Sequence, residues 1–262
     1  MGRESQSPVL LDEIEQADAW RRGALAAVRA TAPGGPPPPF GMSLDGKPSG
    51  PWLPGCRLDE DPPRADGART RATVRRTDPD TGLCLAAEFT WYADFPVVEW
   101  VLRLANTGTD DSPLLSDIRS LDTLLPGGEG VCLLHWRGDD CSERSYQPGV
   151  APLPSESRLD FAPSGGRPTN GAWPYFNLHQ PAEGGGTIVV VGWPGQWSAT
   201  FAREADQVRV CSGQQLTRFR LRPGEQVRTP VQVLLFYRGE PVRSQNLWRR
   251  WMLAHNLPRP HG

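Results

Sequence analysis

The sequence predicts an all-β protein in which two large antiparallel sheets pack face to face, with a helix near each end of the chain. Glycine and proline are abundant, at 28 residues each of 262, as expected where tight turns join many short strands. Ten tryptophans and regular strand patterns argue against low-complexity disorder. Strands recur at short intervals without alternating helices, which excludes a βαβ architecture.

The N-terminal part of the chain, residues 1–39, is predicted to be a helical arm followed by a linker. Residues 8–30 have an imperfect apolar face of helical period, with Ser7 as the expected N-cap, and such a helix could pack on a neighbouring domain. The segment 31–39 then interrupts regular structure, because consecutive prolines keep the backbone extended and lack amide donors. The β domain is therefore expected to span residues 40–240.

Within this β domain, alternation of apolar and polar residues predicts the individual strands. Residues 83–92 follow the turn 78–82 and form a hairpin with the strand before it. In the next strand, Trp100, Leu102 and Leu104 share one face. The remaining strands are predicted at residues 69–76, 114–125, 131–136, 207–211, 216–221 and 227–237, with an exposed polar connection at 59–67.

The C-terminal residues 246–255 are predicted to form a helix with a wide apolar face. A helix of this kind at the end of a β domain needs a surface to pack against. We therefore expect Trp248, Trp251 and Met252 to dock on another domain, with residues 241–262 leading toward it.

Composition limits the possible functions. The 28 basic and 30 acidic residues are intermixed without a basic run, which argues against nucleic-acid binding. The five cysteines contain no CxxC pair, so neither a metal site nor a disulfide framework is indicated, and no cofactor is expected. The N-terminus carries acidic residues where a signal peptide needs an apolar core, and no apolar run is long enough to span a membrane. The cytoplasm is the expected location.

The segment 173–202 is the part of the domain that most suggests sugar binding. A short apolar strand, 187–191, lies between glycine-rich turns, and the second turn presents Trp193, Gln196 and Trp197 together. Flat aromatic faces beside an amide suit a pyranose, which has an apolar C–H face and a rim of hydroxyls. The same tryptophans would serve equally well as sandwich core, so both interpretations stay open.

Seven short segments, in their order and spacing, resemble the N-terminal domain of glycoside hydrolase family 36, the α-galactosidase (melibiase) family. The similarity runs from residue 40 to residue 262. The segments are FGMSLDGKPS (40–49), DPDTGL (78–83), VVEWVLRLANTG (97–108), PYFNL (174–178), GWPGQW (192–197), LRPGEQVRTP (221–230) and QNLWRRWMLAHNLPR (245–259).

The resemblance implies a galactose-mutarotase-like β-supersandwich joined by a helix to a (β/α)8 catalytic barrel. The family hydrolyses terminal α-galactosides with retention, using two aspartates on the barrel, and neither barrel motif occurs in this sequence. We therefore assign no catalytic residue, and Asp94, Glu99, Asp117 and Asp122 are interpreted as ordinary strand and turn charges. The implied partners are an α-galactoside-type carbohydrate and a catalytic barrel domain or subunit, with a homo-oligomer also possible.

In the family, loops of this domain approach the barrel mouth, and the resemblance points to matching loops here. Asn177 and Gln196 could bind sugar hydroxyls or could instead stabilise turns. The candidate substrate-binding residues are Asp45, Trp52, Trp173, Tyr175, Asn177, Trp193, Gln196 and Trp197.

Two other functions remain open. A free-standing carbohydrate-binding module would use Trp193 and Trp197 as a stacking platform. An aldose-epimerase-like enzyme would use His135 and His179 with Glu99 as acid and base, since mutarotases share the supersandwich architecture. The sequence also leaves open whether the chain is a truncated product, an isolated domain or half of a split enzyme.

Overall fold

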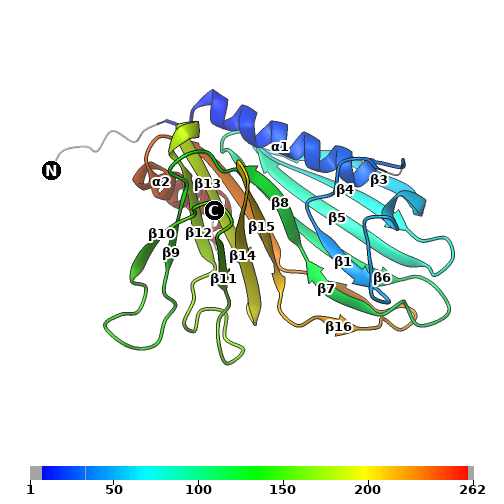
Figure 1. Cartoon of the computed structure of the whole chain (residues 1–262). Coiled ribbons are helices and arrows are strands. Elements are labelled where there is room, and N and C mark those ends of the chain that lie inside the picture. Colours follow the sequence, from blue (N-terminus) through cyan, green and yellow to red (C-terminus); the bar gives the residue numbers. More distant parts are fainter. Residues whose placement is uncertain (1–7, 33, 259–262) are drawn as a thin grey trace.

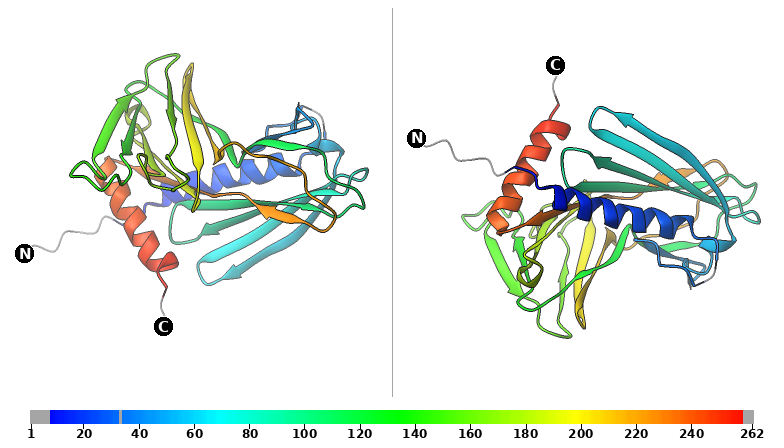
Figure 2. Two further views of the ribbon diagram at one scale, coloured as in Figure 1. Left: turned by 90° about the horizontal axis from the view of Figure 1, so that it is seen from below. Right: turned by 90° about the horizontal axis from the view of Figure 1, so that it is seen from above.

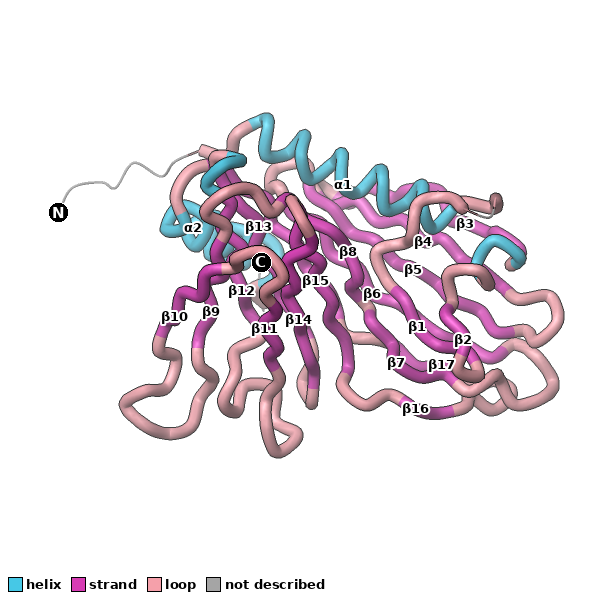
Figure 3. The backbone as a smooth tube through the Cα atoms, in the orientation of Figure 1, coloured by secondary structure: helices cyan, strands magenta, loops and turns pink. Residues whose placement is uncertain are grey.

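The structure is a computed structural model that describes residues 8–32 and 34–258, and its regular structure consists mainly of antiparallel strands (Figures 1 and 3). Two α-helices accompany the strands in this part of the chain, α1 (Leu11–Arg29) and α2 (Pro241–Trp251). One layer is a ten-stranded sheet, and two four-stranded sheets face it across the core. The predicted all-β class with a helix near each end is confirmed, and the second layer is divided in two.

The strands of the ten-stranded sheet are β3 (Arg57–Asp66), β4 (Arg69–Thr77), β5 (Leu83–Tyr92), β6 (Val97–Asn106), β9 (Cys132–Trp136), β10 (Pro148–Pro152), β12 (Tyr175–Gln180), β13 (Gly185–Gly192), β17 (Gln226–Arg228) and β18 (Val231–Arg238). They lie in the order β10-β9-β12-β13-β18-β6-β5-β4-β3, and β17 pairs with β6.

The two smaller sheets contain β1 (Gly41–Leu44), β2 (Lys47–Pro48), β7 (Leu115–Arg119), β8 (Leu121–Pro126), β11 (Arg158–Phe161), β14 (Trp197–Glu204), β15 (Gln207–Gln214) and β16 (Arg218–Phe219). Their strand orders are β16-β7-β1-β2 and β11-β14-β15-β8. The single strand predicted at 114–125 is thus two strands, one in each small sheet.

The main core lies between the layers, because alternate side chains of each strand point inward. Phe89 and Trp100 of the ten-stranded sheet are buried in the same cluster as Trp197, Phe201 and Val210 of the facing sheet.

The ten-stranded sheet is also covered on its outer face, where α2 packs. Val233, Leu235 and Tyr237 of β18 belong to the cluster around α2, whereas Leu234 and Phe236 belong to the main core. This strand is therefore almost continuously apolar, as expected for a strand that is buried on both faces.

Helix α1 lies along one side of the two layers (Figure 1) and buries its apolar face within this domain. Trp20 packs against Trp100 and Phe236, at ring-centroid distances of 5.1 and 6.3 Å. The N-cap is Leu10, and Ser7, the expected N-cap, lies outside the described residues. The helix face that could have packed on a neighbouring domain is used inside the fold.

Buried charges hold both ends of α1. The fully buried Glu13 accepts hydrogen bonds from the backbone amide of Arg238 at 2.7 Å and from the guanidinium of Arg243 on α2 at 3.1 Å. At the other end, the fully buried guanidinium of Arg76 donates to carbonyls at the end of α1 and to that of Cys56. Both charges are favourable, because the N-terminus of a helix is partially positive and its C-terminus partially negative.

Replacing Arg76 by methionine should lower the free energy of unfolding by about 3 kcal/mol, because buried carbonyls lose their donor. Arg75→Met is the matched control, since Arg75 pairs with Asp61 near the surface and such pairs contribute about 1 kcal/mol or less. Urea denaturation measures both variants. Equal losses would contradict the anchoring role of Arg76.

Candidate functional site

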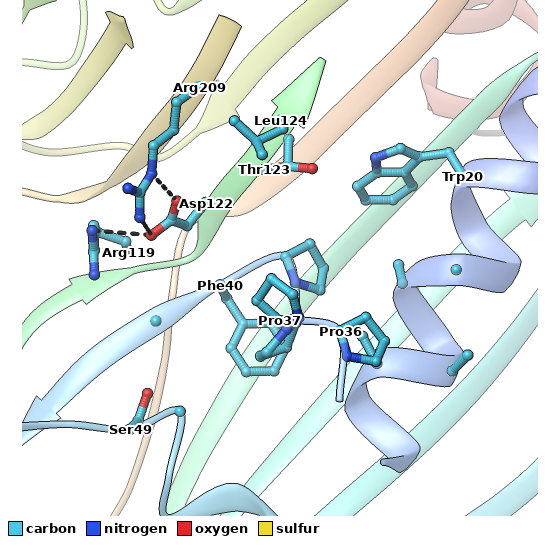
Figure 4. A pocket seen from close by; sticks show the side chains of 18 of the residues that line it. Trp20, Pro36, Pro37, Phe40, Ser49, Arg119, Asp122, Thr123, Leu124 and Arg209 are labelled. Atoms are coloured by element: carbon cyan, nitrogen blue, oxygen red, sulfur yellow. Dashed lines mark hydrogen bonds and ion pairs between the residues drawn. The ribbon is translucent and has the colours of Figure 1, made fainter. Parts of the chain in front are cut away.

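A hollow of ≈ 680 Å³ lies between α1, the proline-rich segment and the strands β1 and β8 (Figure 4). Small side chains of α1 and the prolines at 36–39 give it apolar walls. Asp122, Arg119 and Arg209 form its polar side. Its volume is in the range of small-molecule sites, about 300–1,000 Å³.

Asp122 is at the centre of this polar side. Arg209 donates to both of its carboxylate oxygens, at 2.8 and 3.1 Å, and Arg119 lies 3.0 Å from one of them. Burial opposes ionisation of the carboxyl, but the hydrogen bonds from Arg209 and the charge of Arg119 outweigh it and lower the pKa of Asp122.

The neighbouring Cys211 thiol donates to Asp122 at 3.3 Å. Burial, and then the Asp122 charge, raise the pKa of Cys211 to about 11, so the thiol is protonated at neutral pH. At neutral pH the hollow therefore presents an ionised carboxylate, paired with two arginines, beside a protonated thiol.

A second hollow, of ≈ 380 Å³, lies where β9 and β12 meet α2. We call it the aromatic hollow, and its lining residues are Trp136, Tyr146, Trp173, Tyr175, Gln245 and Trp248. The structure thus brings together Trp173 and Tyr175, which were predicted to bind substrate, and Trp248, which was predicted to dock on a partner.

Trp136 and Tyr146 are not among the predicted site residues. The backbone amide of Trp173 donates to the carbonyl of Trp136 at 3.2 Å, so the pairing of two distant segments brings Trp136 and Trp173 into the lining of one hollow. An aromatic residue at the end of a strand is a weak local signal. Their proximity depends on the pairing of β9 with β12, which no short-range pattern reveals.

Two predicted sugar contacts are corrected by the structure, because their side chains are fully buried. Trp197 lies in the main core and donates its indole N–H to the carbonyl of Pro168 at 2.7 Å. Asn177 donates to Ser244 of α2 at 2.8 Å and accepts from the Tyr237 hydroxyl at 2.9 Å. No sugar can reach either side chain in this fold.

The turn after β13 does not present the expected aromatic platform. Trp193 is half-buried, and the Arg228 guanidinium lies 5.7 Å from its ring centroid. The Gln196 amide accepts from the Gly166 N–H at 3.1 Å and donates to Gln215 at 2.8 Å. Gln196 therefore holds neighbouring loops together, which is the second of the two roles considered for it.

Asp45 lies in the turn between β1 and β2, and Trp52 follows β2. Strand β1 is at the opposite end of the domain from β9, β12 and α2, the elements that form the aromatic hollow (Figure 1). The exposed Asp45 carboxylate accepts from the Leu114 amide at 2.9 Å and from Arg220 at 3.1 Å. Trp52 is half-buried and donates to Asp78 at 3.0 Å. Both side chains stabilise their own loops, and Asp45 remains accessible to solvent.

The predicted docking residues have three different environments. Trp251 is only 2% exposed and packs edge-on against Tyr92, so it is corrected to a core residue of this domain. Trp248 is half-buried and lines the aromatic hollow. Met252 is half-buried beside the cluster around α2.

The two histidines of the epimerase hypothesis face opposite sides of the ten-stranded sheet. His135 packs on Phe161 toward the main core, whereas His179 lies 3.2 Å from the Tyr237 hydroxyl on the α2 side. Burial lowers the pKa of His135. Glu99 is on β6, separated from β12 by two strands, and accepts from the Tyr92 hydroxyl. The acid–base arrangement required by that hypothesis is not formed.

Other acidic residues considered above also have structural partners. Asp94 lies 3.0 Å from the His255 ring nitrogen, and Asp122 is paired with its two arginines. In the chain as described, 8–32 and 34–258, no group of histidine, cysteine and acidic residues could hold a metal ion, and no helix is long and apolar enough to cross a membrane.

Solved structures with a similar architecture include several α-galactosidases. The enzyme from Lactobacillus brevis matches with a TM-score of 0.64 and 15% identity, over 83% of this chain and 31% of its own. From Geobacillus stearothermophilus, the GH36 α-galactosidase AgaB and a variant of AgaA in complex with raffinose give TM-scores of 0.59 and 0.60, both at 18% identity. These matches cover 84% and 82% of this chain and 33% and 32% of theirs. The fold is that of the N-terminal domain of family 36 α-galactosidases.

The structural match confirms the resemblance expected from the seven segments, and at this level of identity it concerns the fold alone. This chain spans about a third of the length of the α-galactosidases that it matches. No protein-family model matches the sequence, and no curated protein matches it. The family 36 domain fold is thus supported by three-dimensional structure.

Asp122→Asn should lower the free energy of unfolding at pH 7 by about 2 kcal/mol, less than for a fully buried pair because both arginines are partly exposed. The folded carboxyl has a lowered pKa, so its stabilising effect is full above the unfolded pKa of about 3.9 and is lost as the pH falls through the folded value. The difference in free energy of unfolding between wild type and Asp122→Asn should therefore become smaller at acidic pH.

Urea denaturation across the pH range from neutral to strongly acidic checks this dependence. Asp160→Asn is the control, because Asp160 pairs with Arg158 at the surface. A gap for Asp122→Asn that stays constant with pH would contradict the account.

Proposed function

We propose that this chain is a non-catalytic domain of an α-galactosidase-like retaining glycoside hydrolase. It docks on a (β/α)8 barrel and helps to shape the sugar pocket there. The observation that carries the proposal is the fold match to α-galactosidases, over 76–84% of this chain and 30–33% of theirs. Two of the matched structures are AgaA variants in complex with raffinose and stachyose.

The chemistry of the described residues supports a binding role rather than a catalytic one. Retaining hydrolysis needs two carboxyl groups about 5 Å apart across the glycosidic bond, one of them able to give and take a proton. Asp122 is held ionised by Arg119 and Arg209, and Glu99 accepts from Tyr92. The reacting carboxylates of the proposed enzyme would come from the barrel.

The end of α2 supports the docking part of the proposal. Trp251 anchors the helix to its own domain, while Leu257 just beyond it is 51% exposed. An apolar side chain at this position is well placed to meet a following domain. On the opposite part of the fold, the exposed loop with Asp45 is the candidate for contact with the sugar pocket.

The proposal is tested with a chimera in which this chain, through Pro258, replaces the N-terminal third of the Lactobacillus brevis α-galactosidase. We expect the chimera to hydrolyse a nitrophenyl α-galactoside and the isolated chain to show no hydrolysis. Hydrolysis by the isolated chain would refute the non-catalytic part. A chimera no more active than the barrel alone would contradict docking.

Two variants of the chimera locate the docking surface. Leu257→Asp should lower its activity at least tenfold by placing a charge against the barrel, whereas Leu216→Asp, at a 92% exposed leucine on another part of the domain, should not. Equal activity of the two variants would show that the end of α2 does not dock.

A further inference from the structure

The aromatic hollow has a composition that the docking role does not explain. Five of its six lining residues are tryptophan or tyrosine, and the sixth, Gln245, is exposed. Tyr146 is 49% exposed, so the hollow opens to solvent at this side. The other four aromatic residues are half-buried. Solvent-accessible aromatic groups gathered in one concave place are typical of an interaction site.

Neighbouring rings of the hollow pack edge to face and are not stacked on one another. Tyr146 and Trp173 meet at 5.1 Å between centroids and 89° between planes. Trp136 and Tyr175 meet at 5.0 Å and 67°, and Tyr175 and Trp248 at 5.5 Å and 71°. In each of these pairs the edge of one ring meets the face of the other. Trp248 also packs against Trp251, at 4.9 Å and 51°.

The polar groups of the hollow are neutral. Its lining offers the Gln245 amide, the Tyr146 hydroxyl and the indole N–H groups, and contains no charged side chain. The Tyr175 hydroxyl is buried without a hydrogen-bond partner among the described residues. Phosphorylated or nucleotide ligands would need cationic groups, which this lining lacks.

The hollow is held by regular structure. Trp136 ends β9, Tyr175 begins β12, and these two strands pair directly. Trp248 is on α2, which is fixed to the sheet through the bond of Asn177 to Ser244. Sites built on paired strands and an anchored helix are largely preformed, which limits the entropy lost on binding.

We propose that the aromatic hollow binds a neutral pyranose, with the C–H face of the sugar stacked on the tryptophan rings. The hydroxyls of the sugar are hydrogen-bonded by Gln245 and by the exposed Tyr146. A neutral sugar ring is the ligand that combines an apolar face with uncharged hydrogen-bonding groups at its rim, as this lining does. The site does not depend on the docking role, because the isolated chain contains all of its residues.

The full chain is titrated with galactose, glucose and raffinose up to high millimolar concentration. Intrinsic fluorescence and the NMR signals of the indole N–H groups are followed. We expect saturable changes with at least one of these sugars, centred on the signals of Trp136, Trp173 and Trp248. Absence of any saturable change with all three sugars would overturn the proposal.

Substitutions show whether the sugar binds in the aromatic hollow. Trp173→Ala and Tyr146→Ala should each weaken binding at least tenfold, and Trp173→Phe, which keeps an aromatic face, should retain most of it. Trp193→Ala is the matched control, a half-buried tryptophan that lies outside the hollow, and should leave binding unchanged. Thermal unfolding checks that each variant is folded, and Tyr146, being exposed, tests the site with little risk to folding.

Two further results would also overturn it. One is sugar binding that Trp193→Ala abolishes and Trp173→Ala leaves intact. The other is a pair of findings: Trp173→Ala abolishes the activity of the α-galactosidase chimera, and the isolated chain binds no sugar. Together these findings would show that the hollow contacts protein. If the chimera fails while the isolated chain binds sugar through Trp173, the docking proposal is wrong and the aromatic hollow stands.

Discussion

The buried carboxylate of Glu13 is the interaction on which the arrangement of both helices depends. It accepts from the N-cap amide of Leu10, from the amide of Arg238 at the end of β18 and from Arg243 on α2. Seen from above in Figure 2, α2 is set across the N-terminal end of α1, where this carboxylate lies. A buried charge is tolerated only when it is paired and hydrogen-bonded, so these three elements are fixed relative to one another.

This linkage explains why α2 is an internal part of the domain. Leu247 and Trp251 pack on the outer face of the ten-stranded sheet. A buried hydrogen-bond network of Asn177, Ser244 and Tyr237 further restricts the position of α2 on the sheet. Once α2 is fixed, Trp248 has to lie against Tyr175, and the aromatic hollow follows. Some of the residues that were predicted to bind sugar or a partner thus form the contact between α2 and the sheet. Others remain accessible after that contact has formed.

Local patterns predicted the fold class well, because period-two alternation and turn residues are properties of short segments. They failed where the structure depends on pairing between strands that are distant in the sequence. Residues 59–67 are largely exposed, as expected, yet most of them belong to the edge strand β3, which tolerates Pro62 and Pro63 at a shift in its register. The strand expected at 216–221 is reduced to β16, residues 218–219.

The candidate site was predicted only in part for the same reason. The role of a tryptophan in a strand depends on which face of which sheet it occupies. From the sequence alone, Trp173 and Trp197 were equally good candidates for sugar binding. The pairing of β14 with β15 puts Trp197 in the core, and that of β9 with β12 puts Trp173 beside Trp136. Neither position could be predicted from the residues that are adjacent in the sequence.

The most direct test of this account is amide hydrogen exchange of Glu13→Gln. If the buried carboxylate couples the helices, exchange should quicken at least tenfold in both α1 and residues 244–251 of α2, equivalent to about 1.4 kcal/mol. Asp12→Asn, which removes an exposed partner of Arg238, should change little. Faster exchange confined to α1, with α2 as protected as in the wild type, would contradict the central role of Glu13.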